Sequence, residues 1–231
     1  MSPIHSSMKR LLLLVVALAS TCVAGAAQFD RAAYVTRLQT CDAILQSTML
    51  YPDRAIPASI LRRAKGIVIV SQDEVSLVLG FKHGWGVALV KKPTGQWSVP
   101  VFIKANELSF GLQAGGKTIE TIYLLMDEPS TKLLFQSQFK FGVDAKAVAG
   151  PATAEAERST AVFDAQVLVY SNVKGFYAGA TVKTGSISPL VDDTQQFYGT
   201  QYRIPEIMFS DWVKPQPESQ PLMNNLQRLT Q

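Results

Sequence analysis

Histidine and cysteine are almost missing from this 231-residue chain, which contains two of each. His5 and Cys22 lie in the first 27 residues, so a chain processed after that segment keeps only His83 and Cys41. One residue of each type cannot form an intramolecular disulfide or a zinc site with cysteine and histidine ligands. Both kinds of stabilising centre are therefore excluded for the processed chain.

The usual machinery of nucleophilic catalysis is equally scarce. A Ser-His-Asp or Cys-His arrangement would have to use His83, and the sequence contains no Gly-x-Ser-x-Gly elbow. The acidic pairs at 73–74, 155/157 and 192–193 lie in polar, turn-like contexts that are typical of solvated surface. We therefore predict a protein that is not an enzyme, with no catalytic residue, no bound metal and no cofactor.

Charged residues make up only 17% of the chain and hydrophobic residues 47%, a balance that favours a folded domain over a disordered one. Removal of Lys9 and Arg10 with the first segment lowers the 22 basic residues to 20, against 18 acidic residues. A net charge this small gives little support to a nucleic-acid partner.

The first 27 residues have the features of a secretory signal peptide. Lys9 and Arg10 precede an apolar run at 11–19, and small residues follow at 24–27. The run breaks at Ser20, short of the roughly 20 apolar residues that a membrane-spanning helix needs. We predict a signal peptide at 1–27 and an exported protein that is periplasmic, associated with the envelope, or secreted. A lipid anchor at Cys22 ranks second, because the residues before it fit a lipidation site poorly.

The rest of the chain predicts an α+β fold. Tyr34, Leu38, Cys41, Leu45 and Met49 recur at helical spacing and indicate an N-terminal amphipathic helix. Shorter helices are expected at 57–65, 130–135 and 192–198. Segments rich in Val, Ile, Phe and Tyr predict strands at 67–70, 75–81, 85–91, 97–104, 108–113, 118–126, 163–170, 175–183 and 186–190.

Few helical patterns separate these strands, so hairpins and antiparallel pairing are favoured. Repeated glycines within or beside the strands suggest bends and close backbone approach, and hence a strongly curved or barrel-like sheet. We predict a single domain at 28–214. The proline-containing residues 215–231 are expected to form a flexible C-terminal tail.

Seven short segments, taken in order, resemble the SYLF domain family, a group of lipid-binding domains that includes exported bacterial members. They are AKGIVIV at 64–70, GWG at 84–86, GQWSVP at 95–100, SFGLQAG at 109–115, AGP at 149–151, YSNVKGFYAG at 170–179 and FYG at 197–199. The resemblance implies non-catalytic binding to membrane lipids, with phosphoinositides as ligands in eukaryotic relatives and actin binding in some. For an exported bacterial member, actin is not expected as a partner.

One stretch matches a nucleotide-binding pattern. GLQAGGKT at 111–118 satisfies Gly-x4-Gly-Lys-Thr, but a phosphate loop needs a helix after it, and the following residues favour a strand. We therefore expect a glycine-rich hairpin with a surface lysine and no nucleotide partner. His83 is expected in a solvated turn.

For the lipid-binding surface the candidates are Lys82, Trp85, Lys91, Lys92 and Lys104, which strand alternation and the turn at 93–95 could bring to one rim. Lysines near an anionic bilayer contribute about 1 kcal/mol each. Trp85 has the amphipathic ring that is favoured at membrane interfaces, although core packing is the commoner role of a strand tryptophan. The predicted function is binding of a phospholipid or phosphoinositide-like headgroup, with no protein partner identified. The alternative is a structural or protein-interaction component of the bacterial envelope.

Overall fold

The computed structural model describes residues 29–51, 55–76, 79–110, 115–151, 157–172 and 185–231. The chain divides into two units, Met1–Asp30 and Arg31–Gln231, and the description below concerns the second. The predicted signal peptide at 1–27 and the predicted strand at 175–183 lie outside the described residues.

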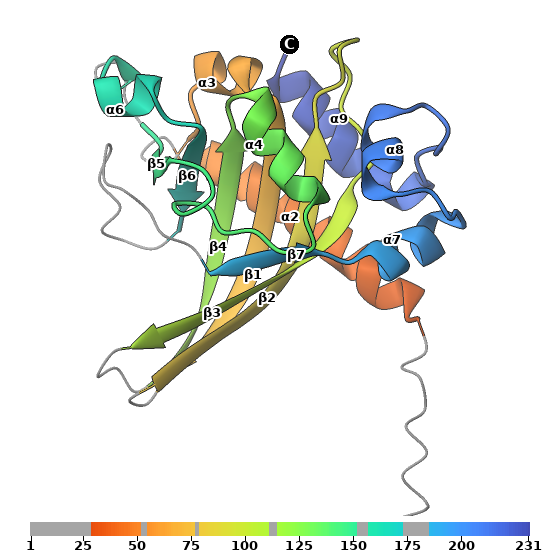
Figure 1. Ribbon diagram of the computed structural model, residues 1–231, viewed down its shortest axis with the longest axis horizontal. Coiled ribbons are helices and arrows are strands. Elements are labelled where there is room, and N and C mark those ends of the chain that lie inside the picture. Colours follow the sequence, from red (N-terminus) through yellow and green to blue (C-terminus); the bar gives the residue numbers. More distant parts are fainter. Residues whose placement is uncertain (1–28, 52–54, 77–78, 111–114, 152–156, 173–184) are drawn as a thin grey trace, which may run out of the picture. The chain divides into compact units, whose positions relative to one another are not determined.

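The described strands and helices alternate unevenly along the chain (Figure 1). The strands are β1 Gly66–Ser76, β2 Leu79–Val90, β3 Val101–Phe110, β4 Gly115–Leu125, β5 Ala147–Ala149, β6 Val167–Ser171 and β7 Ser186–Pro189. The helices are α2 Arg31–Leu50, α3 Ala58–Arg63, α4 Glu128–Lys132, α6 Thr160–Phe163, α7 Val191–Tyr198, α8 Ile204–Phe209 and α9 Gln220–Leu229, with 3-10 turns η1 Leu133–Phe135 and η2 Pro217–Ser219.

The strands form one sheet in the order β5-β6-β4-β1-β2-β3-β7. Every pair is antiparallel except β5 with β6, which is parallel. No pairing among the described residues joins β5 to β7, so the sheet is open at both edges. The α+β class is confirmed, while the closed, barrel-like form of the prediction is not.

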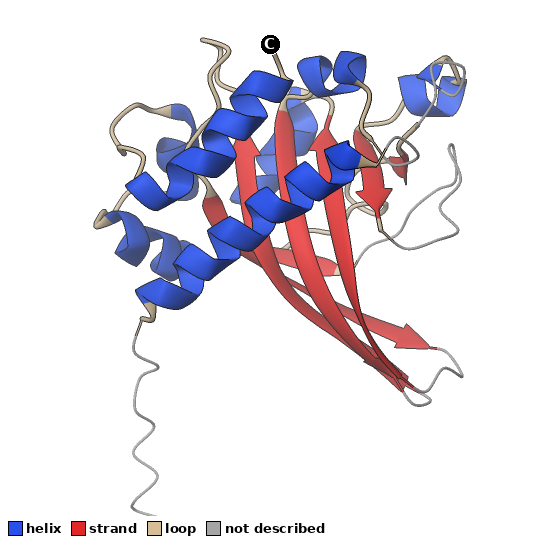
Figure 2. Ribbon diagram, turned by 180° about the vertical axis from the view of Figure 1, so that it is seen from behind, coloured by secondary structure: helices blue, strands red, loops and turns tan. Residues whose placement is uncertain are grey.

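Helices cover both faces of the sheet at one end. Figure 2 shows α2 and α9 lying across one face, where the Cys41 thiol donates to the Ile69 carbonyl at 3.7 Å. The Tyr34 ring of α2 packs edge-on against Phe102 of β3, with 4.7 Å between centroids. On the other face, α4, η1 and the chain after them pack through contacts such as that of Phe141 with Tyr123 of β4.

The two central strands carry the core. Residues 67–70 of β1 and 87–90 of β2 are fully buried, which requires apolar partners on both faces. Gly86 sits in this tight region, and a Cβ there would lie 1.9 Å from the Ile69 carbonyl oxygen. The position therefore accepts only glycine, as the prediction of close backbone approach implied.

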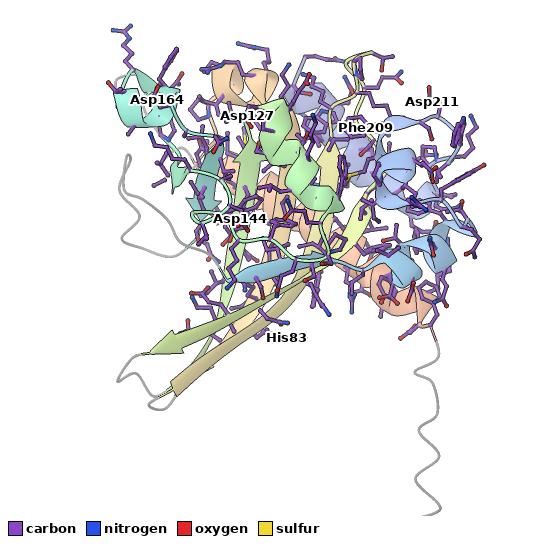
Figure 3. The ribbon with its side chains drawn as sticks, viewed as in Figure 1. His83, Asp127, Asp144, Asp164, Phe209 and Asp211 are labelled. Atoms are coloured by element: carbon purple, nitrogen blue, oxygen red, sulfur yellow. The ribbon has the colours of Figure 1, made fainter. Side chains whose placement is uncertain are left out.

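The same strands run on beyond the helices, and here the predicted boundaries were wrong. The sequence predicts separate strands at 67–70 and 75–81, but β1 is continuous through the polar residues 71–74, in a part of the sheet that no helix covers (Figures 1 and 2). His83 lies on this part of β2, paired with Asp73 and Asn106, and not in a turn (Figure 3). Asp73 and His83 are exposed here, as suits polar residues beyond the covered part of the sheet.

Helix α2 lies where the N-terminal helix was predicted. Tyr34, Leu38, Cys41 and Leu45 are buried along one side of α2, as expected, and Ile44 joins them. Met49, the last residue of the predicted stripe, is only half-buried.

The predicted flexible tail at 215–231 is wrong. Residues 217–229 form η2 and α9, and Leu222 and Leu226 are buried. The Trp97 indole N–H donates to the Thr230 hydroxyl at 3.0 Å in a buried contact. Three prolines suggested an extended chain, but Pro217 and Pro221 occupy first-turn positions, where proline suits a helix.

This packing makes the C-terminal helix part of the stable core. We expect Leu226→Ala to lower the free energy of unfolding by about 2–5 kcal/mol, because it removes a fully buried side chain. Urea unfolding measures the change, and Asn224→Ala, on an exposed position of the same helix, should stay within about 0.5 kcal/mol. Equal effects of the two substitutions would contradict the packed arrangement.

Candidate functional site

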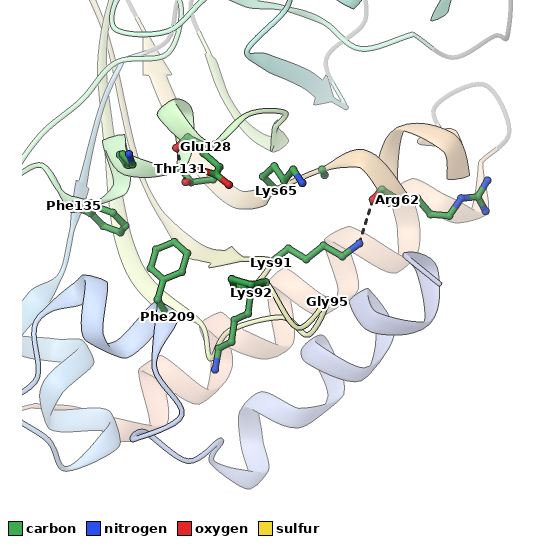
Figure 4. A pocket seen from close by; sticks show the side chains of 12 residues that line it. Arg62, Lys65, Lys91, Lys92, Gly95, Glu128, Thr131, Phe135 and Phe209 are labelled. Carbon is green, nitrogen blue, oxygen red and sulfur yellow. Dashed lines mark hydrogen bonds between the residues drawn. The ribbon is translucent and has the colours of Figure 1, made fainter.

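A basic pocket opens where the buried part of β1 and β2 ends. It has a volume of about 480 Å³ and lies between the end of α3, the β2–β3 connection, α4–η1 and α8 (Figure 4). The lining residues are Arg62, Ala64, Lys65, Lys91, Lys92, Pro93, Gly95, Glu128, Thr131, Lys132, Phe135 and Phe209.

The strand register places two lysines side by side at this pocket. Gly66 pairs with Val90, and the next step of the ladder joins Lys65 and Lys91, whose backbone N–H donates to the Lys65 carbonyl at 2.7 Å. Like charges directly opposite each other across a strand pair are destabilising. The pairing therefore concentrates positive charge at a fixed place on the backbone.

The pKa of the Lys91 side chain reflects that positive charge. Its ammonium donates to the Arg62 carbonyl at 3.2 Å, across the pocket wall from Lys65 (Figure 4). Burial lowers the pKa of Lys91 below its usual value of 10.5, and the neighbouring charge of Lys65 lowers it further. A bound anion would oppose both effects, because it would stabilise the charged form of the lysine.

The remaining charges of the pocket are mostly positive. Lys132 of α4 and Arg62 of α3 line it, and Glu128 is its one acidic residue. Among the described residues, none of these three side chains forms an ion pair, and neither do Lys65 and Lys91. Several cations of the pocket therefore have no ion-pair partner in the described part of the chain.

An aromatic wall closes the other end of the pocket. Phe135 of η1 and Phe209 of α8 meet edge-to-face, with 5.7 Å between ring centroids and 76° between planes. Phe209 is 42% exposed, so part of its ring is available to a ligand at the surface. The arrangement combines cationic groups with an apolar surface, which suits an amphiphile that carries a negative headgroup.

Lys92, one of the predicted ligands, points away from the cluster (Figure 4). Its ammonium donates to the Ser210 carbonyl at 2.8 Å and to the Asp211 carboxylate at 2.7 Å, with only 11% of the side chain exposed. The hydrogen bond from Lys92 and its charge lower the pKa of Asp211. Lys92 therefore fixes the chain after α8.

The other predicted site residues lie elsewhere. Lys82 is nine residues from Lys91 along β2, about 30 Å at 3.3 Å per residue, and pairs with Glu107 at 3.1 Å. Lys104 is exposed and stands opposite Trp85 in the ladder. The half-buried Trp85 ring lies 5.8 Å from the Arg37 guanidinium of α2. The prediction of one common rim was wrong, since only Lys91 and Lys92 line the pocket.

Cys41, His83 and the described part of the nucleotide-binding pattern do not line the basic pocket. Burial raises the pKa of the Cys41 thiol to about 12, so this cysteine is a poor nucleophile. His83 Nδ1 lies 2.7 Å from the Asn106 side-chain oxygen. Residues 111–114 of the nucleotide-binding pattern lie outside the described structure, and residues 115–118 begin strand β4 where a phosphate loop requires a helix. No group of three or more metal-ligating side chains occurs within the described ranges.

Four residues of the pocket were not predicted from the sequence: Arg62, Lys65, Lys132 and Phe209. Lys65 and Lys91 lie 26 positions apart, and only the β1–β2 register, with Gly66 opposite Val90, reveals that they are neighbours. Lys132 and Phe209 come from covering elements whose placement the sequence pattern does not give. Arg62, at the end of a predicted helix, was the most accessible of the missed signals.

The proximity of the two lysines can be tested by titration. We expect Lys65→Met to raise the pKa of Lys91 but to leave it below 10.5, because burial, the larger cause, remains. NMR of the lysine side chains against pH measures the shift, and Lys104→Met should leave it unchanged. An unaltered pKa of Lys91 in Lys65→Met would show that the two charges do not interact.

The same pKa predicts a pH dependence of stability. Because the folded chain binds the Lys91 proton less tightly than the unfolded chain, this residue makes stability rise as pH approaches 10.5. We expect Lys91→Met to lose that part of the rise, measured by urea unfolding across the pH range. Comparing the two proteins removes the contribution of groups they share, such as Tyr198, whose pKa burial raises.

Among the described helices, none combines the length and apolar character that a bilayer crossing requires.

The chain is similar to several eukaryotic proteins. It is 24% identical over 166 residues to the SH3 domain-containing YSC84-like protein 1 of Homo sapiens, covering 71% of this chain and 48% of that protein. It is 28% identical over 180 residues to Protein YSC84 of Saccharomyces cerevisiae, covering 76% of this chain and 38% of that protein.

LAS seventeen-binding protein 3 of Saccharomyces cerevisiae is 26% identical over 179 residues, covering 76% of this chain and 39% of that protein. The chain thus spans at most about half the length of these relatives. A family model named Ysc84 and described as "Las17-binding protein actin regulator" matches residues 106–229, more than half of the chain. The chain therefore belongs to the Ysc84 family, the SYLF group that its ordered segments resemble.

Proposed function

We propose that this domain binds the headgroups of anionic membrane lipids, without catalysis, through the basic pocket. The observation that carries the proposal is the register of β1 and β2, which sets Lys65 against Lys91 with no described carboxylate in an ion pair with either. An anion bound beside the two lysines would relieve this repulsion, because it would stabilise their charged forms. Phosphate groups of lipids supply that charge, and the Phe135–Phe209 wall offers an apolar surface for the adjoining chain.

The surroundings of the pocket suit a membrane surface. Helices α3 and α6 lie at the same end of the domain in both views (Figures 1 and 2). Arg62 and Arg63 occupy the last turn of α3, and Phe163 of α6 is 73% exposed. Basic side chains attract anionic lipid, while exposed aromatic rings enter the interface.

The expected strength is modest. At about 1 kcal/mol for each cation near an anionic surface, Lys65, Lys91 and Lys132 together supply about 3 kcal/mol, roughly a hundredfold in affinity. That is enough for reversible, peripheral association. The predicted export of the chain stays a proposal, and it would place this surface against envelope lipids.

A second candidate is binding of a protein in place of a lipid. It is favoured by the printed name of the yeast relative LAS seventeen-binding protein 3 and by the description of the family model. In this case the cluster of cations would face an acidic patch on the partner.

Vesicle binding separates the two candidates. The full chain is mixed with vesicles of phosphatidylcholine alone and of phosphatidylcholine with an anionic phospholipid, and bound protein is measured by co-sedimentation at increasing salt. We expect binding only to the anionic vesicles, weakening as salt screens the charges. The triple variant Lys65→Gln, Lys91→Gln, Lys132→Gln should lose roughly a hundredfold in affinity.

A matched control carries the same change of net charge. Lys104→Gln, Lys140→Gln and Lys146→Gln together remove three exposed lysines outside the pocket, including one of the residues predicted from sequence, and should bind nearly as the wild type. Equal losses of vesicle affinity in both triple variants would show that the net charge of the protein, and not the pocket, determines binding. Absence of vesicle binding by the wild type would reject the lipid proposal and leave the protein-partner candidate.

A further inference from the structure

A second surface cavity lies beyond α8 and differs in chemistry from the basic pocket. It is a groove of about 560 Å³ between the end of α7 and the chain that follows α8. Its lining residues are Tyr198, Gly199, Thr200, Gln201, Tyr202, Trp212, Val213, Lys214 and Gln216.

Two exposed aromatic rings form one wall of this groove. Trp212 is 63% exposed and Tyr202 is 39% exposed, and their centroids are 5.1 Å apart with 48° between the planes. In contrast, Trp97 is buried and Trp85 packs near α2. The Trp212–Tyr202 corner therefore presents a broad aromatic surface that the described residues leave exposed.

Hydrogen bonds hold the backbone at both aromatic residues. The Tyr202 carbonyl accepts from the Gln195 side chain at 3.0 Å, and its N–H donates to the Thr200 hydroxyl at 3.3 Å. The Trp212 N–H donates to the Ser210 hydroxyl at 3.2 Å, and Val213 next to it is buried. Less backbone entropy is therefore lost when a ligand binds at this corner.

The rest of the lining is polar and largely uncharged. Gln201 and Gln216 each offer an amide with donors and an acceptor, and Lys214 is the one ionisable side chain among the lining residues besides the tyrosines. Gly199 has φ +65°, and a Cβ there would have nothing within 4 Å, so this side of the groove is open.

We propose that this groove binds a carbohydrate, with a pyranose ring stacked on the Trp212–Tyr202 corner. The C–H face of a sugar complements the electron-rich face of an aromatic ring. Sugar hydroxyls both donate and accept, which matches the glutamine amides on both counts. A proline-rich peptide also docks on aromatic grooves, but its prolines offer only carbonyl acceptors, so the acceptor half of the amides would be unused.

The groove has no carboxylate among its lining residues, whereas glycoside hydrolysis uses a pair. The proposal is accordingly binding without cleavage. It is independent of the lipid proposal, because the two cavities share no lining residue.

The test titrates the full chain with short oligosaccharides of glucose and of N-acetylglucosamine, and binding is followed by ligand-observed NMR of the sugar signals, a readout that does not depend on Trp212. We expect saturable binding with a Kd of about 1 mM or tighter, little changed by salt, and at least a tenfold loss in Trp212→Ala. Tyr51→Ala removes another exposed ring, just after α2, and should bind the sugars as the wild type does. Vesicle binding by Trp212→Ala should be unchanged.

Three results would overturn the proposal. The first is no saturable response of the wild type to either sugar series up to about 10 mM, well above the expected Kd. The second is binding that Trp212→Ala leaves intact. The third is saturable binding of a proline-rich peptide, lost in Trp212→Ala, by a wild type that ignores the sugars, which would reassign the groove to peptides.

Discussion

Burial of β1 and β2 on both faces is the constraint on which the rest of the domain depends. Residues 67–70 and 87–90 have no exposed surface, so each face of the sheet must be covered by an apolar layer. Helices α2 and α9 supply one layer, and the segment through η1 and Phe141 supplies the other. Because a slip of one residue would exchange the side chains between two differently shaped layers, the register of these strands is strongly specified.

That register also creates the basic pocket. Once Gly66 stands opposite Val90, Lys65 must lie beside Lys91 at the point where the covering layers end. The resulting repulsion lowers the stability of the folded chain, and it could have been avoided by one neutral residue. Unfavourable features that a fold holds rigidly in a cleft are typical of functional sites. The position of the pocket thus follows from the packing of the core, and its lysines make it basic.

The sequence was informative wherever one residue type dominates a local pattern. The apolar spacing of Tyr34, Leu38, Cys41 and Leu45 predicted α2, and the run at 67–70 predicted the heart of β1. It failed where tertiary context decides. The polar residues 71–74 stay in a strand because β1 extends past its helices, and Pro217 and Pro221 start helical turns instead of preventing them. Both errors came from treating a local signal as if the surroundings were uniform.

The lysines predicted for the site show the same limit of sequence-based prediction even more clearly. Lys82, Lys91, Lys92 and Lys104 look equivalent in the sequence, yet the fold gives them four different surroundings. Lys92 shows why composition cannot separate them: its ammonium is largely buried and holds Ser210 and Asp211. Those two residues lie between Phe209, which faces the basic pocket, and Trp212, which faces the second groove. A lysine expected to bind a ligand instead positions the short segment that presents one aromatic ring to each cavity. Its contribution to either site is therefore geometric, and charge counting alone would assign it the wrong role.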